Sequence, residues 1–463
     1  MQKWNHDRKI ARKKNINIDQ YLNGLPVVLL LFWRNLNNSF VIMMLQFINT
    51  TKLIFFFLFI CSSIAYAQKT DIILTGEVLG RNSEKILLSK CTQDPHSEHI
   101  IIPVKDKKFE YKVSLDTTEA YQLIFEDELA VGTWLPIIFF PDSVNVKFTL
   151  FDKGNTQKNK IEGGKLNSDY NLSLTRGYEI FKDRISAIKK KIKILSDAGN
   201  LYSEKYKSLM ADLSKASNDD EKRSIYKDQE ELRKTGLDRS LEGAALKLDQ
   251  DKLLLEQIKW KYETIQKNPS IASYFLLLKD MNLAKTSPEI AMEFDNTYQV
   301  LSKRFPAHKY TRLIKNEMSG FNQIRPGGKF IDFTAPDLNG SKIKLSELIK
   351  NKVSVIILWG SWCGPCIATS RTIVPLYKKY NNKGFAVVGI AREFKNNQAL
   401  LSRLDKESFS WPNLLELDDE NNIWNKYGIS NAAGKVLLVD KKGTILAVDP
   451  SAQIIGGYLE NHL

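Results

Sequence analysis

Cysteine and histidine are scarce in this chain, which has four cysteines and five histidines in 463 residues. Only Cys363 and Cys366 have Cys-x-x-Cys spacing, and from residue 327 onwards His462 is the only histidine. A structural zinc ion needs four ligands, so the lack of a second pair disfavours a zinc site. A redox-active dithiol and a buried structural pair are the alternatives that remain for these two cysteines.

Long apolar runs and clustered basic residues are also missing. The apolar run from Leu53 to Ile60 is too short for a membrane span. The formal net charge is +14, but beyond residue 67 the lysines are scattered, without a basic patch that has interleaved aromatic residues. This charge indicates a solvated surface and argues against nucleic acid as a partner. The apolar content of 43% excludes a disordered chain, and the length predicts two or three domains.

The segment Trp362-Cys363-Gly364-Pro365-Cys366 lies between a strand pattern and a helix pattern. Residues 353–359 resemble a buried strand, and residues 367–380 have helical periodicity. Cys363 is therefore expected at a helix N-terminus, where free backbone N–H groups and the helix dipole favour a thiolate. Pro365 suits the first helical turn. We predict that Cys363 is the nucleophile and Cys366 the resolving cysteine, with Trp362, Gly364 and Pro365 in supporting positions.

Residues 1–67 are predicted to be an N-terminal extension that contains a secretory signal peptide. A basic residue and a short apolar run precede Ala65-Tyr66-Ala67, which has the pattern of a cleavage site. The mature chain is then expected to begin at Gln68, and translation to start at Met43 or Met44. A lipoprotein anchored through Cys61 is the competing interpretation.

Residues 70–164 have the pattern of a β domain, because short strand-like runs alternate with turn residues. The seven predicted strands are 71–79, 85–89, 100–104, 108–115, 121–125, 134–140 and 143–150. Their spacing favours a small β-sandwich. Cys91, His96 and His99 form an array that a metal would fit, but we expect a free or buried structural thiol at Cys91 and no metal site.

Residues 165–320 are predicted to be helical. No proline occurs between Pro141 and Pro269, and apolar residues recur at three- and four-residue spacing. Breaks are expected at 218–220 and 268–270. The apolar stripe is typical of packing within one chain, and either a helical-hairpin spacer or a coiled coil that self-associates would satisfy it.

Residues 327–463 predict an α/β domain of thioredoxin topology. Strands at 329–333 and 342–345 are expected to flank a turn at 337–340. Strands at 353–359 and 385–391 then alternate with helices, and a hairpin of strands 436–439 and 444–448 precedes a last helix from about Ala452. The predicted fold class is therefore multidomain, with a β-sandwich, a central α-helical region and a C-terminal thioredoxin fold.

This C-terminal region resembles the TlpA/ResA-like thiol–disulfide oxidoreductases of the AhpC/TSA–redoxin group. The matching segments are 333–340, 359–366 and 438–443. The three-part layout is similar to envelope proteins of gram-negative bacteria that carry an N-terminal β domain of unknown function. The resemblance implies a periplasmic or cell-envelope enzyme without a cofactor. Its implied partners are disulfide-bearing envelope proteins and a membrane thiol-reductase that supplies electrons.

The chain departs from the pattern of this family at two places. Gly434 lies near the position where thioredoxin-like proteins place a cis-proline, and glycine adopts unusual backbone angles without enforcing a cis bond. The positions of the group's carboxylates hold Ile357 and Thr369, so deprotonation of Cys366 is expected to depend on water, the helix or a partner. Arg371 is expected on a solvated helix face.

The Gly-Pro pair between the cysteines is the same as in reducing thioredoxins, which favours a reductase over an oxidase. One alternative is an AhpC-type thiol peroxidase, although Ile356 and Gly360 stand where that loop needs proline and threonine or serine. The other alternative is a non-catalytic envelope binding protein whose redoxin domain senses redox state.

Overall fold

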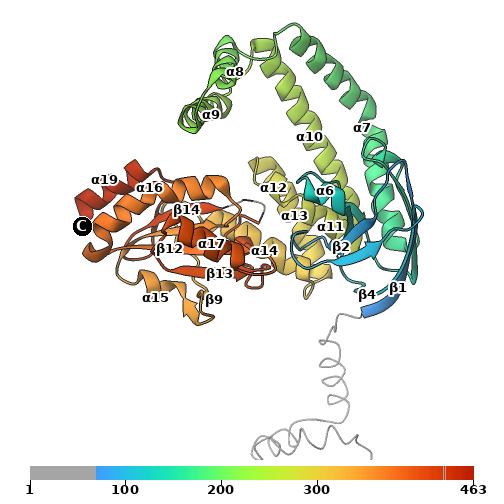
Figure 1. The fold of residues 1–463 in the computed structure, drawn as a ribbon. Coiled ribbons are helices and arrows are strands. Elements are labelled where there is room, and N and C mark those ends of the chain that lie inside the picture. The colour runs from blue at the N-terminus through green and yellow to red at the C-terminus, as the bar shows by residue number, and fades with distance from the viewer. Residues whose placement is uncertain (1–68, 431, 433) are drawn as a thin grey trace, which may run out of the picture. The chain divides into compact units, whose positions relative to one another are not determined.

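The computed structural model describes residues 69–430, 432 and 434–463 (Figure 1). The predicted extension and signal peptide, residues 1–67, lie outside the described residues. All the described residues fall within one unit by their mutual contacts. Across this part of the chain, no helix is both long enough and apolar enough to cross a membrane.

The first described region forms two four-stranded sheets. One has the order β4-β1-β7-β8 and contains β1 (Lys69–Leu79), β4 (Lys108–Asp116), β7 (Asn145–Phe151) and β8 (Lys160–Glu162). The other has the order β3-β2-β5-β6 and contains β2 (Lys85–Lys90), β3 (Ile100–Pro103), β5 (Tyr121–Phe125) and β6 (Ile137–Phe139). Alternate side chains of both sheets enter one core, which includes Leu74, Ile86, Leu123 and Phe148. A short helix, α6 (Glu126–Ala130), and a 3-10 turn, η1 (Thr156–Lys158), complete the region.

All seven strands predicted in this region are present. The run at 134–140 pairs only over Ile137–Phe139, because Pro136 has no N–H to donate to a ladder. The strand β8 was not predicted, since its three residues are too few and too polar to show alternation.

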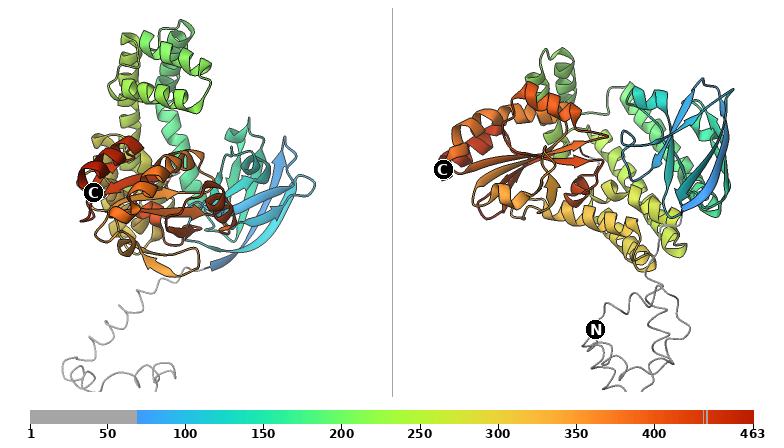
Figure 2. Two further views of the ribbon diagram at one scale, coloured as in Figure 1. Left: turned by 60° about the vertical axis from the view of Figure 1, so that its left-hand side comes forward. Right: turned by 60° about the horizontal axis from the view of Figure 1, so that its bottom comes forward.

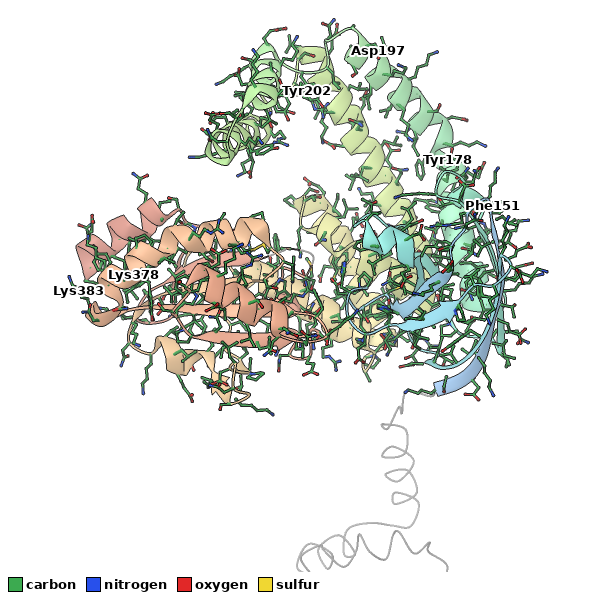
Figure 3. All side chains as sticks on the ribbon, in the orientation of Figure 1. Phe151, Tyr178, Asp197, Tyr202, Lys378 and Lys383 are labelled. Carbon is green, nitrogen blue, oxygen red and sulfur yellow. A yellow bond between two sulfur atoms is a disulfide. The ribbon has the colours of Figure 1, made fainter. Side chains whose placement is uncertain are left out.

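Helices fill the next region. They are α7 (Lys165–Asp197), α8 (Glu204–Lys215), α9 (Asp219–Lys234), α10 (Leu241–Lys267), α11 (Ile271–Lys279), α12 (Met281–Ala284), α13 (Pro288–Arg304) and α14 (Lys309–Gln323). The two predicted breaks are confirmed, because α9 begins at Asp219 and a capping box on Ser270 begins α11. Figure 3 shows Tyr178 and Asp197 along α7, which packs on α10. At this crossing an added Cβ on Gly177 would lie 2.9 Å from the Trp260 ring.

The last region is a five-stranded sheet of order β13-β12-β11-β14-β15. Its strands are β11 (Val353–Trp359), β12 (Phe385–Glu393), β13 (Asn413–Leu417), β14 (Lys435–Val439) and β15 (Ile445–Val448). Its helices are α15 (Leu345–Ile349), α16 (Gly364–Tyr380), α17 (Gln398–Glu407), α18 (Ile423–Lys426) and α19 (Ala452–His462), with a 3-10 turn η2 (Asn381–Lys383) after α16. Helices lie on both faces of the sheet (Figure 2). Every residue of β11 is therefore buried, which explains its unbroken apolar run.

One predicted strand of this region was misplaced, and one strand was missed. The first strand of the hairpin is β9 (Thr334–Pro336), which pairs with β10 (Lys342–Lys344), and not 329–333. Asp337 accepts hydrogen bonds from the N–H groups of Asn339 and Ser341, which closes a tight turn directly after β9. The strand β13 was missed because it is a five-residue edge strand that includes the buried Glu416.

Candidate functional site

The dithiol lies at the start of α16. Cys363 is the N-cap residue, Gly364 begins the helix and Pro365 lies in its first turn. The Cys363 Sγ accepts a hydrogen bond from the Cys366 N–H at 3.2 Å. At the other end of the helix, Lys378 lies in the last turn, with Lys383 just beyond (Figure 3). The positive end of the helix dipole and the free N–H groups of the first turn lie at Cys363, so this helix favours a thiolate there.

The two cysteines are joined by a disulfide, with their Cα atoms 5.3 Å apart. Cys363 is 3% exposed in this disulfide form, whereas Cys366 is partly exposed. In the oxidised state Cys366 is therefore the more exposed of the two cysteines. The two cysteines also differ in their place on the helix, because Cys363 precedes the first turn and receives an N–H while Cys366 lies inside that turn.

Trp362 forms the exposed rim beside the disulfide. Its side chain is 48% exposed, and its indole Nε1–H donates to the Arg392 carbonyl at 3.0 Å. The indole also stacks on Phe394, with ring centroids 6.2 Å apart. An added Cβ on Gly360 would lie 2.6 Å from the indole nitrogen, so a side chain at this position would displace Trp362. The tryptophan is thus held in one orientation while part of its surface stays exposed.

A buried carboxylate, Glu393, contacts Ser361, two residues before Cys363, and was not predicted. Glu393 is 3% exposed and accepts hydrogen bonds from the N–H and the hydroxyl of Ser361, both at 2.7 Å. Burial raises the pKa of the Glu393 carboxyl, and the two bonds from Ser361 partly offset this effect. The register of β11 with β12 explains this contact. Trp359 pairs with Ala391, so Ser361 and Glu393 each lie two residues beyond the same pair.

Gly434 lies opposite the dithiol, directly before β14. An added Cβ there would be 2.2 Å from the Leu358 carbonyl oxygen and 2.9 Å from the Cys366 Sγ. Its φ lies outside the left-handed region. Glycine is therefore not required here for a left-handed backbone angle. The position needs glycine because the sheet and the disulfide leave no space for a side chain.

The remaining predicted residues have other contacts. Arg371 forms a bidentate ion pair with Glu407 of α17, so it lies on the exposed face of its helix as predicted. Ile357 is buried in the core of the sheet. Cys91 is a free cysteine whose thiol pKa is raised by burial. No cluster of three potential metal ligands occurs among the described residues.

The C-terminal region has a five-stranded sheet with an antiparallel edge, and helices flank this sheet. A Cys-x-x-Cys disulfide lies at the N-terminus of one helix. These features define a thioredoxin-like redoxin domain. Comparison with known proteins agrees with this class. The model of the AhpC/TSA family matches residues 326–448. The C-terminal part of this chain is thus a redoxin domain of the thiol–disulfide oxidoreductase type.

Several relatives share this domain. Thiol-disulfide oxidoreductase ResA of Bacillus anthracis is 28% identical over 141 residues, which is 30% of this chain and 76% of the relative. A thioredoxin-like protein of Haemophilus influenzae is 30% identical over 114 residues, covering 22% of this chain and 66% of that protein. Among solved structures, a putative thiol-disulfide oxidoreductase from Bacteroides vulgatus is 26% identical, with a TM-score of 0.27, and covers 30% of this chain and 99% of its own.

Proposed function

We propose that this protein is a cell-envelope thiol–disulfide oxidoreductase that reduces disulfides in protein substrates. The observation that carries the proposal is Cys363 as N-cap of α16, with the Cys366 N–H directed at its sulfur. This arrangement stabilises a thiolate on one cysteine and keeps the second within bonding distance. Disulfide exchange needs both properties.

The proposed reaction has two exchange steps. The Cys363 thiolate attacks one sulfur of the substrate disulfide, that bond breaks, and the released substrate thiolate takes up a proton. Cys366 then loses its proton and attacks the Cys363 sulfur, which frees the second substrate thiol. The substrate gains two electrons and two protons, and the chain is left with the Cys363–Cys366 disulfide. A membrane thiol-reductase is the proposed source of electrons for the next cycle.

The direction of exchange is testable through the reduction potential. With Gly364 and Pro365 between the cysteines, we expect a potential of about −220 to −280 mV. Equilibration of the full mature chain with glutathione and dithiothreitol buffers, followed by alkylation and mass measurement, gives this value. A potential above about −150 mV would mean that the dithiol acts as an oxidant, and the reductase proposal would then be wrong.

The proposed location depends on the signal peptide at the N-terminus. Cleavage after Ala67 is expected to release a mature chain that begins at Gln68. N-terminal sequencing of the protein recovered from the envelope fraction of its native cells measures this directly. A lipid on Cys61, or an N-terminus within residues 1–67, would contradict the proposed cleavage.

The regions before the redoxin domain are proposed to be a β-sandwich and a helical spacer. Support for the sandwich comes from the single apolar core that its two four-stranded sheets share. Support for the spacer comes from the second apolar core, which joins α10, α11, α13 and α14 to Ala120 and Phe140 of the β region. Self-association through the helices remains part of this proposal.

A further inference from the structure

One run of lysines stands out from the otherwise scattered basic residues, and it lies on α7. Residues 182–193 contain six basic residues and one acidic residue, which gives this segment a net charge of +5. Lys182, Arg184 and Lys193 each form an ion pair with a neighbouring acid. The three lysines at 189–191 are exposed, and their ammonium groups make no ion pair or hydrogen bond within the part of the chain that the structure describes. Most of the unpaired positive charge of α7 is therefore concentrated in one helical turn.

The inner face of α7 is occupied by α10. Phe181, Ile188 and Leu195 recur every seven residues and are buried or half-buried. The Phe181 ring meets the edge of the Trp260 ring of α10, with the ring centroids 6.3 Å apart. Seven residues are nearly two full turns of a helix, so these three residues form one packed stripe. Contacts within the chain account for this face of the helix.

A second apolar stripe lies on α7 outside that contact. Ile180, Ala187 and Ile194 each precede one of the packed residues, so they are rotated from the packed stripe by about 100° around the helix. Ile180 and Ile194 are 54% and 57% exposed, and Ala187 is exposed as well. The stripe lies between Tyr178 and Asp197, which are labelled in Figure 3. An exposed apolar stripe beside a run of lysines is typical of a helix that lies on a membrane surface.

Further apolar side chains are exposed where α7 ends and α10 begins. The hydroxyl of Ser240, the N-cap residue of α10, donates to the Asn200 carbonyl at 2.5 Å and joins the two helix ends. Leu237 and Leu241 are both exposed at this junction. Exposed apolar residues thus occur at this end of the helix pair as well as on the α7 stripe.

The charge of α7 distinguishes between the surfaces that could cover this stripe. A second copy of the chain would place another segment of net charge +5 against the first, and like charges repel. A bilayer that contains phosphatidylglycerol has the opposite charge. It also has an apolar interior, where the isoleucine side chains are more stable than in water. The observed combination of charge and apolar residues therefore fits an anionic lipid surface.

We propose that α7 docks the protein on an anionic lipid surface through its basic stripe, which we define as the lysines at 189–191 together with Ile180, Ala187 and Ile194. This proposal rests on the proposed function only through the cell-envelope location, because a membrane must be within reach. It concerns where the protein is held and leaves the chemistry of the dithiol unchanged.

The test measures sedimentation of the full mature chain with vesicles of phosphatidylethanolamine and phosphatidylglycerol in equal parts. The wild-type chain should bind these vesicles, and should not bind vesicles in which phosphatidylcholine replaces phosphatidylglycerol. Binding should weaken as the salt concentration rises from about 0.1 M to about 1 M, because the screening length falls from about 10 Å to about 3 Å.

Two variants separate the contributions of charge and apolar surface. Combined Lys189→Gln, Lys190→Gln and Lys191→Gln should weaken vesicle binding about a hundredfold, because each lysine near an anionic surface contributes about fivefold. Combined Ile180→Gln and Ile194→Gln should weaken it at least about tenfold, because apolar side chains are lost from the interface. Glutamine has nearly the helix propensity of lysine, so both variants should fold and should reduce insulin at the wild-type rate without vesicles.

Combined Lys105→Gln, Lys107→Gln and Lys108→Gln is the matched control. These lysines are exposed in the β region, and their replacement removes the same charge. The control should bind vesicles like the wild type. An equal loss in the control, unchanged binding of the isoleucine variant, or a wild-type chain that dimerises through the stripe and binds neither vesicle would overturn the proposal. Failure of the proposed function looks different, because the wild-type chain would then not reduce insulin in solution.

Discussion

Replacement of Cys363 by serine should abolish disulfide exchange, with a loss of about 10³-fold or more, because serine supplies no thiolate to attack a disulfide. Cys366→Ser should keep the first step and stop at a mixed disulfide between Cys363 and the substrate. In the reduced wild-type chain, Cys363 is expected to react with iodoacetamide at a lower pH than an ordinary free thiol does, because the helix N-terminus lowers the pKa of its thiol. Insulin reduction, non-reducing gels and peptide mapping of alkylated sites measure these three results.

Cys91→Ser serves as the control for these cysteine variants. Cys91 is a free thiol whose pKa is raised by burial, so the native protein should not be alkylated there, and its loss should not affect turnover. Preferential alkylation of Cys366, or a titration midpoint near 8.5, would show that the helix N-terminus does not activate Cys363. Peroxide turnover that survives in Cys366→Ser would instead favour the peroxidase alternative.

Gly434→Ala should impair exchange about tenfold or more and destabilise the redoxin domain by about 1–3 kcal/mol. The added methyl group would lie 2.2 Å from the Leu358 carbonyl oxygen and 2.9 Å from the Cys366 Sγ. Either the loop or the start of α16 must then move, and a shift of this size misplaces the reacting sulfurs. Insulin reduction and thermal unfolding followed by circular dichroism measure the two effects.

Gly457→Ala is the matched control for this substitution. Gly457 lies in α19, where an added Cβ meets nothing within 4 Å, and alanine favours a helix over glycine. This variant should exchange disulfides at the wild-type rate and be no less stable. Wild-type activity in Gly434→Ala would show that the space beside Cys366 does not govern exchange.

The position of the dithiol was predictable because its signals are local. A buried strand, two cysteines three residues apart and a following helix are consecutive in the chain, so Cys363 had to lie at a helix N-terminus. The strand pattern of the first region was equally readable, because alternate residues of each strand enter one shared core. The hairpin at 334–344 was only partly predicted, since the turn at Asp337 determines which residues pair.

The sequence by itself determined the Cys-x-x-Cys pair at a helix start and the change from β to helical to α/β regions, because each depends on residues a few positions apart. Tertiary structure alone decided what surrounds the dithiol. Glu393 meets Ser361 through the register of β12 with β11, and Glu317 meets Ser430 across 113 positions of sequence. Such contacts depend on how strands pair and helices dock, which no local pattern of residues encodes.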